Sequence, residues 1–132
     1  YSAVGEHLGT VRTGGQPVAL AVEPRGRMLH LANRNGSCTA ISISLAGGML
    51  NWSVLRKWKT AARPLDIAAA FSRKQVFVLE ADNTVRVYSF AGQRLGSIPV
   101  PRGSSALKVV PRSRTLYLLS RNGTFTKQQS PF

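Results

Sequence analysis

One β-rich segment occurs three times along the chain, and this repetition constrains the fold more than any other feature of its 132 residues. Residues 17–43 form the first copy, which contains three short apolar runs joined by two turns. The second copy starts at Pro64, 47 residues after Pro17, and the third copy places Pro111 40 residues after Phe71. A period of this length is typical of propellers, solenoids and other arrays.

Within each copy, apolar residues alternate with polar ones or form short runs bounded by turn residues, as β-strands do. Asn35-Gly36 predicts a two-residue hairpin turn, because this pair supplies the positive φ that such a turn requires. In the fourth strand of the first copy, period two places Leu50, Trp52, Val54 and Trp58 on one face. The expected strands are residues 7–13, 18–23, 28–33, 38–45, 49–58, 65–70, 75–81, 84–90, 93–98, 106–110, 115–120 and 123–127.

Two segments also have a helical interpretation. Residues 52, 55, 58 and 62 are spaced as on one face of a helix, and the alanine run 68–70 has a high helix propensity. The alignment of residues 65–70 with the first strand of the first copy favours a strand there.

The strand count predicts an all-β fold of β-propeller-type repeats, with three four-stranded blades in a single repeat domain. The expected blades are residues 17–63, 64–103 and 104–132, and the strand in residues 1–15 completes the last blade. Propellers normally have four to eight blades, so three should not close a ring. Two chains that exchange their first strands would close a six-bladed homodimer. The alternative is that the chain is a segment of a longer propeller.

The repeats resemble those of the YVTN-type, lactonase-like β-propeller family. The resemblance rests on the turn Pro24-Arg25-Gly26-Arg27, on the strand Leu29-His30-Leu31-Ala32-Asn33, and on residues 116–123 of the third copy. The chain departs from the family pattern at residues 71–74, which lack the glycine, and in its small number of acidic residues. The resemblance implies a propeller fold and carries almost no function, because propellers include both enzymes and passive binding proteins.

The chain is strongly basic, with 18 Lys and Arg against 5 Asp and Glu and a formal net charge of +13. The electric field of such a positively charged protein attracts polyanions. Two cations lie in the turn after the first strand of each copy, and equivalent turns of a propeller share one rim. We therefore expect a polyanion-binding rim formed by Arg25, Arg27, Arg73, Lys74, Arg112 and Arg114. The alternative is that these cations only solubilise the protein.

The expected partner is a protein or a cell-envelope polyanion. Nucleic acid is a less favoured alternative, because the sequence has no helix-based DNA reader and only 8% aromatic residues. A third alternative is a structural subunit that assembles with its own kind and takes no small ligand.

We expect no catalytic activity and no cofactor. A metal-dependent, lactonase-like hydrolase is the catalytic alternative, and Asn33, Asp66 and Glu80 are the oxygen ligands that it would use. His30 replaces the aromatic residue of the repeat and is expected to be a half-buried ring. Cys38 lies in an alternating strand and is expected to be a small buried or half-buried residue rather than a reactive thiol.

No run of about 18 apolar residues occurs, so the sequence predicts no transmembrane segment. The chain starts at Tyr1 rather than Met, from which we expect a removed leader or further upstream sequence. A periplasmic or secreted location is the favoured expectation.

Overall fold

The computed structural model describes Thr10, Arg12 and residues 16–132, and every structural statement below refers to this part of the chain. It contains three antiparallel sheets in which the strands are hydrogen-bonded in chain order. The first sheet comprises β1 (Pro17–Val22), β2 (Met28–Asn33), β3 (Ser37–Ala46) and β4 (Met49–Lys59). The second comprises β5 (Pro64–Ala70), β6 (Gln75–Glu80), β7 (Thr84–Ser89) and β8 (Arg94–Pro99). The third comprises β9 (Ser104–Val109), β10 (Thr115–Ser120) and β11 (Phe125–Gln129).

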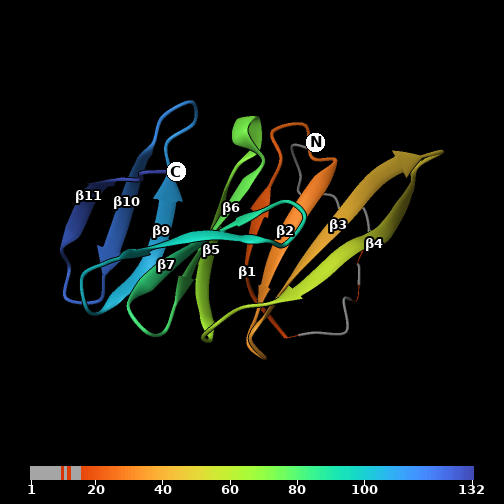
Figure 1. The fold of residues 1–132 in the computed structure, drawn as a ribbon. Helices are drawn as coiled ribbons and strands as arrows, with labels where there is room; N and C mark the ends of the chain where they lie inside the picture. Colours follow the sequence, from red (N-terminus) through yellow and green to blue (C-terminus); the bar gives the residue numbers. More distant parts are fainter. Residues whose placement is uncertain (1–9, 11, 13–15) are drawn as a thin grey trace.

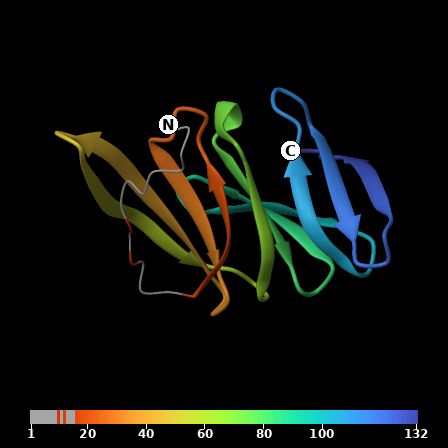
Figure 2. The same ribbon diagram turned by 180° about the vertical axis from the view of Figure 1, so that it is seen from behind.

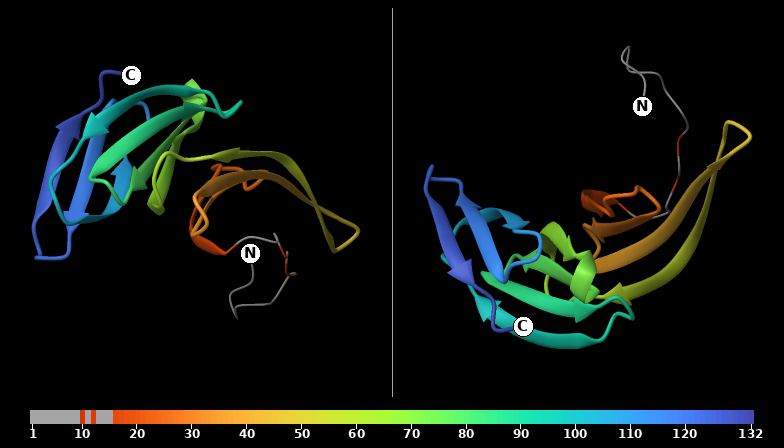
Figure 3. Two further views of the ribbon diagram at one scale, coloured as in Figure 1. Left: turned by 60° about the horizontal axis from the view of Figure 1, so that its bottom comes forward. Right: turned by 90° about the horizontal axis from the view of Figure 1, so that it is seen from above.

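The three sheets follow one another as blades, with the second sheet between the other two (Figure 1). The first strand of each blade is its innermost strand, because β5 contacts both β1 and β9. The same order is visible from behind and from above (Figures 2 and 3). The all-β prediction is therefore confirmed, and both helical alternatives are wrong: residues 52–58 lie in β4 and the alanine run lies in β5. The structure contains no helix long and apolar enough to cross a membrane within the described residues.

Two hydrophobic cores hold the blades together. Between the first and second blades, Ala32 and Cys38 pack with Val76 and Val78, and between the second and third blades Phe77 packs with residues that include Leu116. Side chains of β6 point alternately into the two cores, which explains why its sequence is almost continuously apolar. Each fully buried Val, Leu or Phe side chain in these cores contributes roughly 1.5–3 kcal/mol through removal of apolar surface from water.

The apolar face predicted along β4 is interrupted by a β-bulge. Ala40 pairs with Arg56, but Ile41 pairs with Val54, so one extra residue of β4 lies between these pairs. The bulge reverses the alternation of side chains between the two faces. Trp58 consequently packs against the core next to the second blade, whereas Trp52 and Val54 lie on the opposite face and are 42% exposed. The prediction that these residues share one face is wrong.

The turn chemistry also differs from the prediction. The connection between β2 and β3 has three residues, 34–36, and of these only Gly36 has a positive φ (+87°). This is the pattern of a three-residue hairpin with glycine in the left-handed position. The tight two-residue turn lies instead at Gly47-Gly48, where both φ angles are positive.

The third blade has three strands in the described part of the chain, and its last strand is Phe125–Gln129 rather than residues 123–127. The strand expected at residues 7–13, which should complete this blade, lies largely outside the described residues. The strand exchange that it would permit therefore stays a prediction.

Candidate binding surfaces

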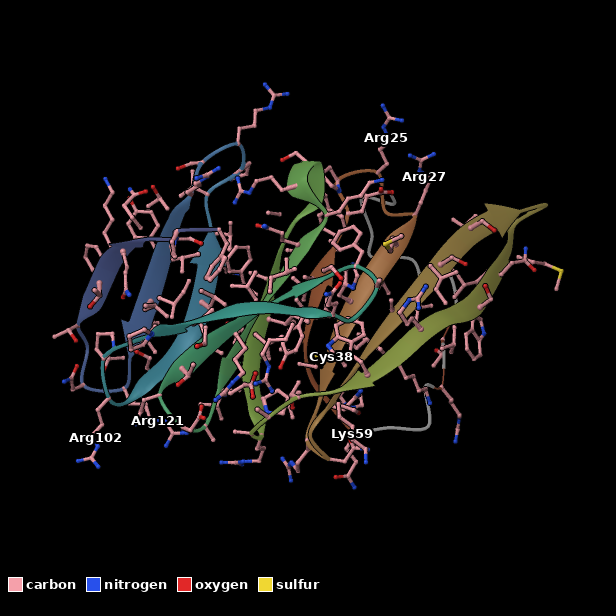
Figure 4. All side chains as sticks on the ribbon, in the orientation of Figure 1. Arg25, Arg27, Cys38, Lys59, Arg102 and Arg121 are labelled. Carbon is pink, nitrogen blue, oxygen red and sulfur yellow. The ribbon has the colours of Figure 1, made fainter. Side chains whose placement is uncertain are left out.

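The turns that connect the first two strands of each blade lie at one edge of the structure. We call the residues of these turns, 24–27, 71–74 and 111–114, the upper rim (top of Figure 1). The turn 71–74 contains the 3₁₀ turn η1 (Phe71–Arg73) and ends at Lys74, which takes the left-handed conformation with φ +52°. The rim carries all six cations that the sequence predicts for polyanion binding, and Figure 4 shows Arg25 and Arg27 extending from it.

Four of the six upper-rim cations are exposed and have no ion-pair partner among the described residues. These four are Arg25, Lys74, Arg112 and Arg114. Arg27 pairs with Glu23 at 3.2 Å, and this contact is largely exposed and therefore weak. Arg73 donates to the backbone oxygen of Ser113 at 2.9 Å, so its guanidinium ties the turn of the second blade to that of the third.

Beside the upper rim lies a hollow that we call the inner groove, with a volume of about 560 Å³. It runs between the inner strands, where small side chains such as Ala68 and Ala69 leave space. Leu20 is 60% exposed and Val22 is 50% exposed in its wall. Lys108 and Arg112 also line it, so the inner groove combines an apolar surface with positive charge. The sequence analysis missed this groove, although three successive alanines in an inner strand are a signal for it.

The opposite edge, which we call the lower rim, consists of the turns 34–36, 81–83 and 121–124 and the linkers 60–63 and 100–103. The three proposed metal ligands lie near this edge, and each is engaged in hydrogen bonds. Asp66 accepts from the backbone amides of Ile67 (2.8 Å) and Leu107 (2.7 Å), which joins β5 to β9. Asn33 donates to the hydroxyls of Ser37 (3.2 Å) and Thr39 (3.0 Å).

Glu80 is fully buried and is the centre of a polar network. Its carboxylate accepts from the Ala62 amide at 2.6 Å, from Arg86 at 3.1 Å and from the Tyr88 hydroxyl at 3.0 Å. Arg86 also donates to Asp82, and this contact lowers the pKa of Asp82. The described residues include no group of three or more His, Cys, Asp or Glu side chains that could hold a metal ion. Glu80 thus has a structural role in the network.

Two further titratable groups are buried between the first and second blades. His30 is fully buried rather than half-buried, because Trp58, Phe71 and Phe90 surround its ring with centroids 4.6–6.4 Å away. Burial lowers the pKa of His30 from 6.5 to about 4. Cys38 is buried as predicted, and burial, with a smaller effect of the Glu80 charge, raises the pKa of its thiol to about 12. Such a thiol is protonated and unreactive at neutral pH.

The lower rim is also basic, which the sequence analysis did not predict. Figure 4 shows Arg102, Arg121 and Lys59, the last residue of β4, extending from this edge. Two more cations, Arg34 and Arg63, lie in the turn 34–36 and the linker 60–63. The signal was present in the repeats, because an arginine follows the second strand in two of the three copies and another lies in each linker between blades.

No protein-family model matches the chain, and no curated protein matches it. Among solved structures, the chain is similar to hydrazine synthase from Kuenenia stuttgartiensis, with a TM-score of 0.66 and 23% identity over 88% of this chain and 33% of that one. It is also similar to BamB from Moraxella catarrhalis, with a TM-score of 0.67 and 13% identity over 90% and 35%. A third similar structure is the WD40 repeats of RRP9, with a TM-score of 0.69 and 14% identity over 90% and 37%.

At these identities the likeness shows the fold alone. WD40 repeats are blades of β-propellers, so the prediction of β-propeller-type repeats is confirmed. The chain spans about a third of the length of each of these structures.

Proposed function

We propose that the chain is a non-catalytic β-propeller binding scaffold whose upper rim engages an anionic partner, either a protein or a cell-envelope polyanion. The observation that carries the proposal is the juxtaposition of four exposed, unpaired cations with the inner groove. Propeller repeats present turns and inner-strand ends at one mouth, where partners commonly bind. The combination of charge and apolar surface favours an acidic protein segment with apolar side chains over a uniformly charged polymer.

The non-catalytic character of the proposal is supported by the roles of the acidic residues. A lactonase-like hydrolase would need Asn33, Asp66 and Glu80 as metal ligands, but the Asp66 carboxylate already joins the second blade to the third and the Glu80 carboxylate already holds the linker amide of Ala62. The periplasmic or secreted location and the YVTN-type subfamily are further parts of this proposal, and they rest on the sequence alone.

Replacing Arg25, Lys74, Arg112 and Arg114 with Ser is expected to weaken binding to an acidic peptide that carries apolar side chains, such as a peptide of alternating Glu and Leu. Each exposed charge pair contributes roughly 0.2–1 kcal/mol, so the four replacements together should weaken the affinity at least about fourfold. Fluorescence anisotropy with this labelled peptide, oligoglutamate, heparin and duplex DNA measures the change and ranks the classes of partner.

The matched control replaces four exposed cations that lie away from the upper rim, Arg56, Lys57, Arg102 and Arg121, with Ser. Both variants lose the same net charge, so only their position differs. Equal weakening in the two variants would show that total charge attracts the peptide, and the upper rim would lose its special role. Tighter binding of duplex DNA than of oligoglutamate would favour the nucleic-acid alternative.

We also propose that two copies of the chain associate end to end. Both ends of the blade series expose apolar side chains: Trp52 and Val54 on the first blade, and Leu119 (51% exposed) and Phe125 (72% exposed) on the third. The third blade also has a hollow of about 230 Å³ next to these residues. Such faces pack against neighbouring blades in a closed propeller, and two copies would supply six blades.

Sedimentation equilibrium is expected to give a mass of twice 14.3 kDa for the wild-type chain. Replacing Leu119 and Phe125 with Lys places two charges in the interface and should shift the protein to monomers, while replacing the surface residue Arg25 with Ser should not. A wild-type monomer at high micromolar concentration would refute this association.

A further inference from the structure

A second hollow lies at the lower rim, on the opposite edge from the upper rim. It is an open hollow between the β2–β3 turn and the linker that joins β4 to β5, and its volume is about 500 Å³. Ligand pockets typically have volumes of roughly 300–1,000 Å³. We call it the lower pocket. Its lining residues are Arg34, Asn35, Gly36, Ser37, Lys59, Thr60, Ala61, Ala62 and Arg63.

Three of the nine lining residues are cations, and none is acidic. Arg34 comes from the β2–β3 turn, whereas Lys59 and Arg63 are the first and last residues of the run 59–63, so the three cations belong to the two backbone segments that line the hollow. Lys59 extends from this edge in Figure 4. Among the described residues, none of the three has an ion-pair partner.

The acidic residues nearby in the fold already have partners. Glu80 lies behind the linker and accepts from the Ala62 amide, and Arg86 pairs with both Glu80 and Asp82, so these three groups together keep one negative charge. No carboxylate of the described residues forms an ion pair with the three pocket cations, and their three positive charges exceed that one negative charge. Their mutual repulsion makes an external anion the group that would compensate them.

The backbone that carries the cations is fixed by hydrogen bonds. The Arg34 amide donates to Gln16 at 2.8 Å, and the Arg63 oxygen accepts from Ala81 at 2.8 Å. The Thr60 amide donates to Gly36 at 2.9 Å, which joins the linker directly to the turn. Lys59 lies in β4 and pairs with Ser37. These anchors hold the positions from which the three side chains extend, so little backbone ordering is needed when an anion binds.

We propose that the lower pocket binds a compact, multiply charged oxyanion, the phosphate or sulfate group of a small molecule. Two guanidinium groups can each donate in a fork to a pair of oxygens, and the lysine adds a point charge. A tetrahedral dianion presents oxygens in several directions and so suits donors that come from both the β2–β3 turn and the run 59–63. A carboxylate, with a single charge and two oxygens, would leave part of the pocket charge unmatched. This site is independent of the upper rim, and either proposal can fail without the other.

The test is an NMR titration of the ¹⁵N-labelled wild-type chain with inorganic pyrophosphate, inorganic sulfate and acetate at constant ionic strength. We expect saturable shifts of the Gly36, Ser37, Thr60 and Ala61 amides with the first two anions and much weaker shifts with acetate. Inorganic phosphate at about pH 8, where it is mainly a dianion like sulfate, is titrated as well. The stronger binder of phosphate and sulfate identifies whether the natural group is a phosphate or a sulfate, and either order supports the site.

Replacing Arg34 or Arg63 with Ser should weaken pyrophosphate binding about tenfold, because each removes charge-assisted hydrogen bonds. Lys59→Gln retains the length of the side chain and tests the same point if either arginine variant loses its dispersed amide spectrum. Arg121→Ser removes an exposed cation of the third blade that lies outside both proposed sites, so it is the matched control and should leave the affinity unchanged. Equal weakening by Arg121→Ser, no shifts at the Gly36, Ser37, Thr60 and Ala61 amides, or no saturation at millimolar pyrophosphate would each overturn the proposal.

Discussion

Replacement of Glu80 by Ala is expected to lower the free energy of unfolding by about 3–5 kcal/mol, the cost of removing one partner from a buried charged pair. The substitution would leave the Arg86 guanidinium, whose side chain is 15% exposed, with Asp82 as its remaining carboxylate partner. It would also leave the buried Tyr88 hydroxyl and the Ala62 amide without the acceptor that they now share. Urea unfolding at pH 7, followed by tryptophan fluorescence, measures the change.

Two variants separate the charge of Glu80 from its hydrogen bonds. Glu80→Gln retains an acceptor for Tyr88 or Ala62 and should cost less than Glu80→Ala, about 1–3 kcal/mol. Asp82→Asn removes the more exposed partner of Arg86 and should change stability by less than about 1 kcal/mol. If Glu80→Ala stays within about 1 kcal/mol of wild type, the network does not stabilise the fold, and Glu80 becomes available again as a functional carboxylate.

The free energy of unfolding is expected to fall by roughly 3 kcal/mol as the pH is lowered from about 6.5 to about 4. The reason is that His30 binds a proton more readily in the unfolded chain than in the folded one. In the folded state the pKa of His30 is about 4, below its ordinary value of 6.5, so the contribution of neutral His30 is present above pH 6.5 and is lost through this window. Burial among three aromatic rings, with no hydrogen-bond partner for either ring nitrogen among the described residues, is the physical cause.

Urea unfolding at a series of pH values between 7.5 and 4 measures this dependence in the wild type and in His30→Phe. Phenylalanine is the matched replacement, because Phe77 occupies the equivalent position of the second repeat. In His30→Phe, most of the decrease in the free energy of unfolding between pH 6.5 and 4 should be absent. The pKa of Asp82 is lowered, so its contribution is lost only below this window, where pH falls under its ordinary value of 3.8. The same decline in both proteins would show that His30 is not its source.

The blades could be predicted from the sequence because the pattern of apolar residues in each repeat follows from which faces of its strands are buried. Alternation and β-branched runs follow from strands that bury one or both faces, and the prolines at 17 and 64 mark where two of the inner strands begin. The bulge beside Ala40 could not be predicted in this way. It depends on which residue of β4 is left unpaired, and that choice is made by the packing of Trp58 against the second blade.

Of the candidate sites, the upper rim could be predicted from the sequence, whereas the lower pocket and the full burial of His30 could not. The upper rim follows from equivalent turns, so its six cations could be named in advance. The full burial of His30 requires Phe71 and Phe90 from the second blade, and the lower pocket requires the path of the linker after β4. Both arise from contacts between repeats, about which the period of a sequence carries no information.

The alternating side chains of β6 have a consequence for how the molecule unfolds. Val76 and Val78 belong to one core, and Phe77 and Leu79 belong to the other, so this strand cannot detach without opening both. Nearest-neighbour coupling of this kind makes repeats melt together rather than one by one. The central blade thus acts as the cooperative link of the chain, and neither outer blade retains a complete packing partner once that link is lost.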